Sequence, residues 1–175
     1  ETAVVRRAMV VGGGIAGMSA ALAIADHGYP VDLIERSESL GGNLNWIRQT
    51  LEGHAVGPFL EEIRQKTEQH PQIHVYSEAT VVSTWGEAGR FYSAVAARDG
   101  AVVQLEHGAV ILATGGMEAP RQLYGHGTHP AVMTQKEPKL VGTLYLFSSA
   151  TLYENAQLAS EAISGRPGAA FQSAC

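Results

Sequence analysis

The alternation of apolar and polar positions predicts strands and helices in turn over the first part of the chain. The apolar run Met9–Val11 has the length of a strand, and the alanine-rich stretch from about Ile15 to His27 has the length of a helix. Gly28 and Pro30 follow in the usual order of helix-end signals. A second apolar run, Val31–Glu35, completes a strand–helix–strand unit.

The next stretch predicts one more helix and one more strand. Residues 58–68 have a proline in the first turn and an apolar face that we assign to Phe59, Leu60 and Ile63, which indicates an amphipathic helix. Ile73–Tyr76 alternates as a strand does.

The rhythm then changes to short strands separated by glycine-containing turns. Val81–Trp85, Phe91–Ala97 and Ala101–Glu106 predict a three-stranded antiparallel meander. The continuous apolar run Ala109–Ala113 predicts a strand buried on both faces. The fold class expected is a three-layer α/β fold, with a parallel central sheet, the meander on one side and helices on the other.

Composition narrows the class of protein. With 175 residues, 45% hydrophobic and 17% charged, the chain is expected to form one globular domain. A net charge of −5 without a basic run argues against nucleic acid as a partner. Glycines interrupt the uncharged stretch at residues 8–25, which argues against a membrane span. Since Cys175 is the single cysteine, we expect a reducing compartment, the cytoplasm.

The glycines after the first strand indicate a dinucleotide site. Gly12 permits a sharp turn, Gly14 lets the backbone approach a pyrophosphate, and Gly17 allows close helix–strand packing. The free N–H groups at the helix start, at Ile15 and Ala16, are expected to face the phosphates. Glycine-rich turns also arise for packing alone, but here a strand, a helix and a second strand surround the motif.

Features farther along distinguish among dinucleotides. Glu35, at the end of the second strand, is expected to accept the ribose hydroxyls and to repel a 2′-phosphate despite Arg36, which leaves FAD and NAD. The Gly41-Gly42 pair favours FAD, with Asn43 as a donor to a phosphate or the flavin, although an ordinary loop is the alternative. Val81 is expected to pass the adenine.

The assembled motifs resemble the FAD-binding part of the A subunits of heterodisulfide reductases, over about residues 7–137. The segments that carry the resemblance are residues 10–18, 40–44, 50–53, 106–116, 123–125 and 133–135. The resemblance implies a flavin subunit that passes electrons to a redox partner protein or iron–sulfur subunit. It also implies a set of FAD contacts: Gly12, Gly14, Gly17, Glu35, Arg36, Gly42, Asn43, Val81, Ala113, Thr114 and Gly115.

The chain also departs from that family. The nicotinamide-binding insertion and the cysteine-rich motifs are absent, and only the linker Lys136–Lys139 stands where the insertion is expected. Residues 142–147 and 155–164 predict a return strand and helix, so the expected single FAD-binding domain spans residues 1–175, with a core of 7–137 and a return segment of 140–165. Whether the chain is a short flavin-only version or a piece of a larger protein stays open.

Three functional hypotheses follow from these observations. The first is an FAD-dependent oxidoreductase domain, the second is a non-catalytic nucleotide-binding interaction module, and the third is an NAD-binding Rossmann protein. No nucleophile–base arrangement supports His54 or His107 as a catalyst. We expect no metal, because the two histidines of residues 125–129 have no third ligand nearby.

Overall fold

The computed structural model describes residues 4–50, 52–116 and 128. The chain divides into two units, of which residues 1–48 and 55–117 form the first and residues 49–54 and 118–175 form the second. The first unit contains, in order, β1 (Ala8–Val11), α1 (Ile15–Asp26), β2 (Val31–Ile34), the 3₁₀ turn η1 (Gly42–Asn45), α2 (Val56–Gln69), β3 (Ile73–Tyr76), β4 (Ala79–Glu87), β5 (Arg90–Ala97), β6 (Val102–His107) and β7 (Ala109–Leu112).

Four strands form a parallel sheet in the order β3-β2-β1-β7. β1 lies between β2 and β7, so Val10 is opposite Leu33 on one side and opposite Ile111 on the other. Parallel strands end at the same edge of a sheet, and ligands of such sheets bind outside this edge. The segments that follow β1, β2 and β7 therefore come together at one edge.

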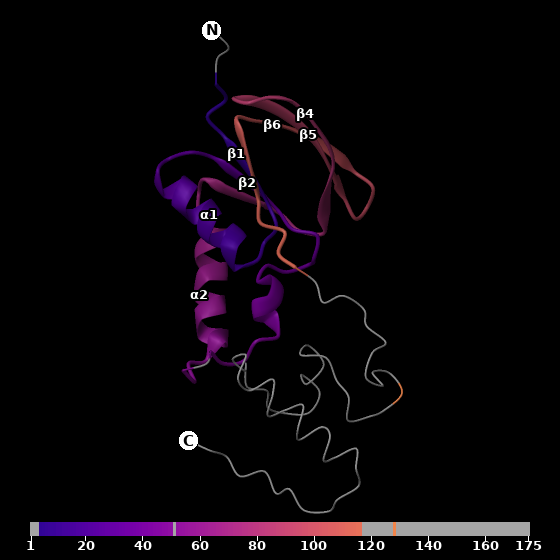
Figure 1. Cartoon of the computed structure of the whole chain (residues 1–175). Coiled ribbons are helices and arrows are strands. Elements are labelled where there is room, and N and C mark those ends of the chain that lie inside the picture. Colours follow the sequence, from indigo (N-terminus) through magenta and orange to yellow (C-terminus); the bar gives the residue numbers. More distant parts are fainter. Residues whose placement is uncertain (1–3, 51, 117–127, 129–175) are drawn as a thin grey trace, which may run out of the picture. The chain divides into compact units, whose positions relative to one another are not determined.

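The helices pack on one face of the sheet (Figure 1). Val10 and Leu33 face this layer and form a buried cluster with Met18 of α1 and Leu60 of α2. The prediction for α2 was wrong at Phe59, which is 49% exposed, because it lies about 100° around the helix from the buried Leu60. Within the described residues, no helix has the length and apolar character that crossing a membrane requires.

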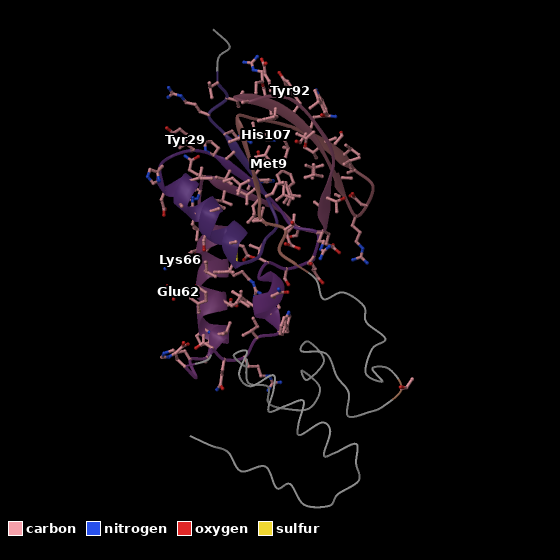
Figure 2. The ribbon with its side chains drawn as sticks, viewed as in Figure 1. Met9, Tyr29, Glu62, Lys66, Tyr92 and His107 are labelled. Atoms are coloured by element: carbon pink, nitrogen blue, oxygen red, sulfur yellow. The ribbon has the colours of Figure 1, made fainter. Side chains whose placement is uncertain are left out.

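The predicted meander is confirmed as the antiparallel sheet β4-β5-β6. It packs on the face of the parallel sheet opposite the helices, as Figure 1 shows. Met9 and Ile34, which alternate with the residues that face the helices, form a second cluster with Ala79, Val95 and Leu105 of the meander. Figure 2 places Met9 in this layer. The three-layer α/β fold is therefore as the sequence predicts.

The prediction that β7 is buried on both faces was wrong. Ala109 is exposed, Val110 and Ile111 are half-buried, and Leu112 is 76% exposed. In the described part of the chain, β7 pairs only with β1 and is therefore an edge strand with one unpaired side. The strand and helix predicted at 142–147 and 155–164, the linker Lys136–Lys139 and the histidines of 125–129 lie outside the described residues.

A charged residue also lies inside the parallel sheet. Asp32 of β2 is 1% exposed, and Nη1 of Arg7 lies 3.0 Å from its Oδ2. Its neighbours along the strand face the helices, so Asp32 faces the meander. A buried carboxylate needs such a partner, since removal of the arginine would leave an uncompensated charge.

Candidate functional site

The first glycine turn, residues 12–17, owes its shape to two close backbone approaches. Gly12 has φ of 110°, and a Cβ there would lie 2.3 Å from the carbonyl oxygen of Ala113. A Cβ on Gly17 would lie 1.7 Å from the carbonyl oxygen of Gly12. No side chain fits at either position, so these two glycines are required for the packing of β1, α1 and the end of β7.

Gly14 differs from both of them. It has an ordinary φ of −74°, and among the described residues a Cβ there would meet nothing within 4 Å. It is the N-cap of α1, which begins without a side-chain cap and without an acidic residue in its first turn. The first N–H groups of a helix have no partner within the helix and attract anions. Ile15 and Ala16 are exposed, and their backbone N–H groups, which have no acceptor within the helix, lie next to the space at Gly14.

The second glycine turn, residues 40–45, packs against the first. Gly41 donates its N–H to the carbonyl oxygen of Gly13 at 2.8 Å, and it forms a bridge with Gly14. A Cβ on Gly42 would lie 3.2 Å from Cα of Gly14. Asn43 is exposed, and its Oδ1 accepts a hydrogen bond from Nε1 of Trp46 at 3.3 Å. The two turns therefore form one surface.

Glu35 connects this surface to the end of β2. Its side chain is 7% exposed, with Oε2 accepting the N–H of Gly13 at 2.6 Å and Oε1 accepting the N–H of Ser37 at 2.7 Å. A carboxylate has about four lone-pair sites, so these two bonds leave capacity for further donors such as ribose hydroxyls. The carboxylate also has a structural role that the sequence alone did not reveal.

An open cleft of about 490 Å³ lies beside the end of β2. It is bordered by Arg36, Ser37, Glu38, Glu78, Thr80, Ala96, Ala97 and Arg98. Glu78 has φ of 51°, donates its N–H to the carbonyl oxygen of Ser37 at 3.0 Å and forms an ion pair with Arg98. Sequence reasoning missed the residues of β4 and β5 here, because only the fold brings these distant segments to Arg36.

Val81 follows the cleft residue Thr80 along β4. Its side chain is partly buried and packs against the cluster between the parallel sheet and the meander. A bulge interrupts the pairing of β4 with β5 between Val81 and Ser83. Because the side chain of Val81 packs between the parallel sheet and the meander, a contact of Val81 with a base would have to come from its backbone.

The segment after β7 completes the edge of the sheet. Ala113 donates its N–H to the carbonyl oxygen of Val11 at 2.8 Å and is partly buried on the helix side. Thr114 and Gly115 are exposed, and Gly115 has φ of 66°. Ala113 and Thr114 thus lie directly against Gly12. That this strand end lies close to a nucleotide stays a prediction.

The histidines that the sequence left without a role lie elsewhere. His74 and His54 are exposed, whereas His107 at the end of β6 is fully buried. Its Nε2 is 3.3 Å from Oγ of Ser93, which in turn is 2.7 Å from Oγ1 of Thr84. This burial lowers the pKa of His107.

Taken together, the residues at the sheet edge fit a dinucleotide. Unpaired donors at the start of α1 suit a pyrophosphate, and the open space at Gly14 gives it room. The lone pairs that Glu35 has left suit the hydroxyls of a ribose, and the cleft beside Arg36 has the volume for a base. Among the predicted contacts, Arg36 borders the cleft, Val81 follows the cleft residue Thr80, and Glu35 lies at the end of β2. The others lie at the two glycine turns and the end of β7.

Comparisons with known proteins agree with this geometry. A family model described as pyridine nucleotide-disulphide oxidoreductase matches residues 6–150. The A subunit of the ferredoxin:CoB-CoM heterodisulfide reductase of Methanosarcina mazei is 29% identical over 92 residues, which cover 50% of this chain and 11% of that protein. An iron-sulfur A subunit of the CoB–CoM heterodisulfide reductase of Methanopyrus kandleri is 34% identical over 90 residues, or 49% of this chain and 13% of that protein. The chain spans 11% to 13% of the length of these curated relatives.

Solved structures show the same fold. L-Proline dehydrogenase from P. horikoshii aligns with a TM-score of 0.59 and 27% identity, over 67% of this chain and 24% of that protein. A bacillithiol disulfide reductase from Bacillus cereus aligns with a TM-score of 0.52 and 16% identity, over 63% of this chain and 40% of that protein. At that identity the second likeness concerns the fold alone.

Proposed function

We propose that this chain, which belongs to the pyridine nucleotide-disulphide oxidoreductase family, is the flavin-carrying domain or subunit of an electron-transfer enzyme. It is an FAD-dependent oxidoreductase domain similar to the A subunits of heterodisulfide reductases. The observation that carries the proposal is that the second glycine turn, Glu35 and the end of β7 all meet the first glycine turn, at Gly14, Gly13 and Gly12 respectively.

Each part of the site has its own task in this proposal. The N–H groups at Ile15 and Ala16 bind the pyrophosphate, and Gly14 leaves the backbone accessible to it. Glu35 accepts the ribose hydroxyls with its remaining lone pairs. Arg36, which borders the cleft, and the backbone of Val81, which follows the cleft residue Thr80 along β4, hold the adenine.

The other end of the cofactor lies along the second glycine turn and the end of β7. Gly42 and Asn43 contact it from the second glycine turn, and Ala113–Gly115 contact it from the end of β7. When bound, FAD supplies the acceptance and release of electrons, whereas the protein binds and orients it.

The partner is proposed from the names of the relatives. One of them is named an iron-sulfur subunit. We infer that the electrons of this chain pass to or from an iron–sulfur protein, and that the chain works in the cytoplasm. Residues 7–137 are the core of one FAD-binding domain, to which residues 140–165 also belong.

The test of electron transfer uses the full chain, purified without oxygen. We expect flavin absorbance bands, release of FAD on denaturation, bleaching of the bands on photoreduction, and their return when a ferredoxin is added as acceptor. A chain that carries FAD but remains oxidised under photoreduction would support a non-catalytic module instead.

The domain boundaries require a separate experiment. Deletion of residues 138–175 is expected to abolish flavin retention if the return segment belongs to the FAD-binding domain. A deletion variant that unfolds cooperatively and keeps one FAD per chain would show that the core of 7–137 is sufficient.

A further inference from the structure

The second glycine turn is held by a side chain of α2. Arg64 lies in the third turn of that helix, and its Nη2 donates to two acceptors of the turn. One is the carbonyl oxygen of Leu40 at 2.8 Å, and the other is Oδ1 of Asn45 at 2.8 Å. A single nitrogen thus joins the first and the last residue of the turn.

Asn45 passes this restraint to the glycines. Its Nδ2 donates to the carbonyl oxygen of Leu40 at 3.2 Å, and its amide lies against the backbone of Gly41. A Cβ on Gly41 would lie 2.8 Å from Oδ1 of Asn45, and Gly41 has φ of 120°. The side-chain amide of Asn45, which is hydrogen-bonded to Arg64, therefore packs against one side of Gly41 and restrains its position.

From the other side Gly41 is joined to the first glycine turn. Its N–H donates to the carbonyl oxygen of Gly13 at 2.8 Å, and the next residue, Gly42, lies against Gly14. A shift of the second glycine turn would therefore move Gly42 and Asn43 relative to the opening at Gly14. The sequence motif contains the glycines, but nothing in it points to a residue of α2.

Arginine suits this task better than lysine does. Its planar guanidinium carries five donors in a fixed arrangement, and hydrogen bonds from a charged donor are roughly twice as strong as neutral ones. Nη1 of Arg64 also pairs with Oε2 of Glu61 at 3.3 Å, but that carboxylate is 72% exposed. The bonds to Leu40 and Asn45 are thus the ones that bear on the site.

We propose that Arg64 is a positioning residue of the cofactor site, which sets Gly42 and Asn43 through Leu40 and Asn45. It is a donor to the protein and not to the cofactor. The inference rests on the proposed function, namely that the glycine turns hold FAD. Besides packing on the parallel sheet, α2 would then influence the affinity for FAD through Arg64.

The first measurement is FAD affinity in the full chain. Arg64→Ala and Asn45→Ala are each expected to weaken binding by about tenfold or more, the effect of losing one or two charge-assisted hydrogen bonds. Arg64→Lys should bind FAD more tightly than Arg64→Ala, because the lysine keeps a charged donor. It should bind FAD less tightly than the wild type, because an ammonium lacks the fixed, planar donors of the guanidinium. The double variant should bind no more weakly than the weaker single variant, since the two residues act in series.

Lys66→Ala is the matched control. Lys66 lies two residues farther along α2, and its ion pair with Glu62 is exposed on the outer face of the helix (Figure 2). Its removal takes a cation from the same helix without touching the turn, so FAD affinity should equal that of the wild type. A loss equal to that of Arg64→Ala would assign the effect to helix charge and overturn the inference.

The second measurement does not depend on FAD. Hydrogen exchange in the apo chain should become faster at the N–H groups of Gly41, Leu44 and Trp46, which are bonded within or beside the turn. Unchanged exchange in Arg64→Ala overturns the inference whether or not FAD binds. Faster exchange with unchanged FAD affinity gives Arg64 a purely structural role and overturns it too. A wild-type chain that binds no FAD refutes the proposed function instead.

Discussion

Replacement of Glu35 by glutamine separates two roles of this carboxylate. Glutamine keeps the size of the side chain, but it offers one oxygen and one NH₂ group where the carboxylate has two acceptors. Both carboxylate oxygens now accept backbone N–H groups, from Gly13 at 2.6 Å and from Ser37 at 2.7 Å. Whichever way the amide turns, its NH₂ group faces one N–H donor.

The burial of the two donors decides the outcome. Gly13 is buried, whereas Ser37 is exposed and can bond water instead. The amide oxygen should therefore face Gly13, and the bond to Ser37 should be lost. Each bond to a charged acceptor is worth about 1.5–3 kcal/mol, and water recovers part of one of them. We expect the apo chain to lose about 1–2 kcal/mol of its free energy of unfolding.

FAD binding should suffer as well. A neutral oxygen accepts the ribose hydroxyls less strongly than a carboxylate does, and the cost is about 1–3 kcal/mol of binding. Urea unfolding of the apo chain measures the first effect, and titration with FAD, followed by flavin fluorescence, measures the second. Glu68→Gln is the control, because Glu68 is an exposed acid of α2 outside the site.

Each of the two roles of Glu35 has its own contradicting outcome. Unchanged urea unfolding would show that the two backbone bonds contribute nothing to stability. If Glu35→Gln were less stable but bound FAD as tightly as the control Glu68→Gln does, Glu35 would accept only backbone N–H groups. The ribose would then bind elsewhere.

Three further predictions test the glycine turns and the buried histidine. Gly14→Ala should change apo stability by no more than about 1 kcal/mol, because its Cβ meets nothing within 4 Å, but it should weaken FAD binding in a titration. Gly17→Ala should lower the thermal midpoint of the apo chain, because its Cβ would overlap Gly12 and overpacking costs about 1–3 kcal/mol or more; a midpoint equal to that of the wild type would contradict the packing described. Burial lowers the pKa of His107 from its ordinary value near 6.5, so the unfolded chain takes up the proton first and stability should fall as the pH drops below that value. Urea midpoints at about pH 7.5 and about pH 5.5 should differ less in His107→Gln than in the wild type.

Local patterns were enough to predict the strand–helix–strand unit and the meander. Their strands follow the period of two or are continuous apolar runs, and glycine turns separate them. The pattern could not predict how exposed β7 and Phe59 are. A continuous apolar run has the same appearance in a central strand and at an edge, and Phe59 is adjacent in sequence to Leu60, one of the residues that α2 buries.

The candidate site was predictable only where one segment carries its own signal. The glycines of both turns and the acid at the end of β2 have recognisable spacing. The contact between Gly12 and Ala113, the cleft residues Glu78 and Arg98, and the hold of Arg64 on the second turn join segments distant in sequence. Such contacts depend on tertiary packing, which no spacing along the chain encodes.

The central claim is that the glycine turns hold FAD, and a parallel titration of the apo chain with FAD and with NAD⁺ tests it most directly. If they do, FAD should saturate at one per chain, with quenching of flavin fluorescence and a rise in the thermal midpoint that NAD⁺ at the same concentration does not produce. Tighter binding of NAD⁺ than of FAD, or no saturable binding of FAD by a folded chain, would contradict it.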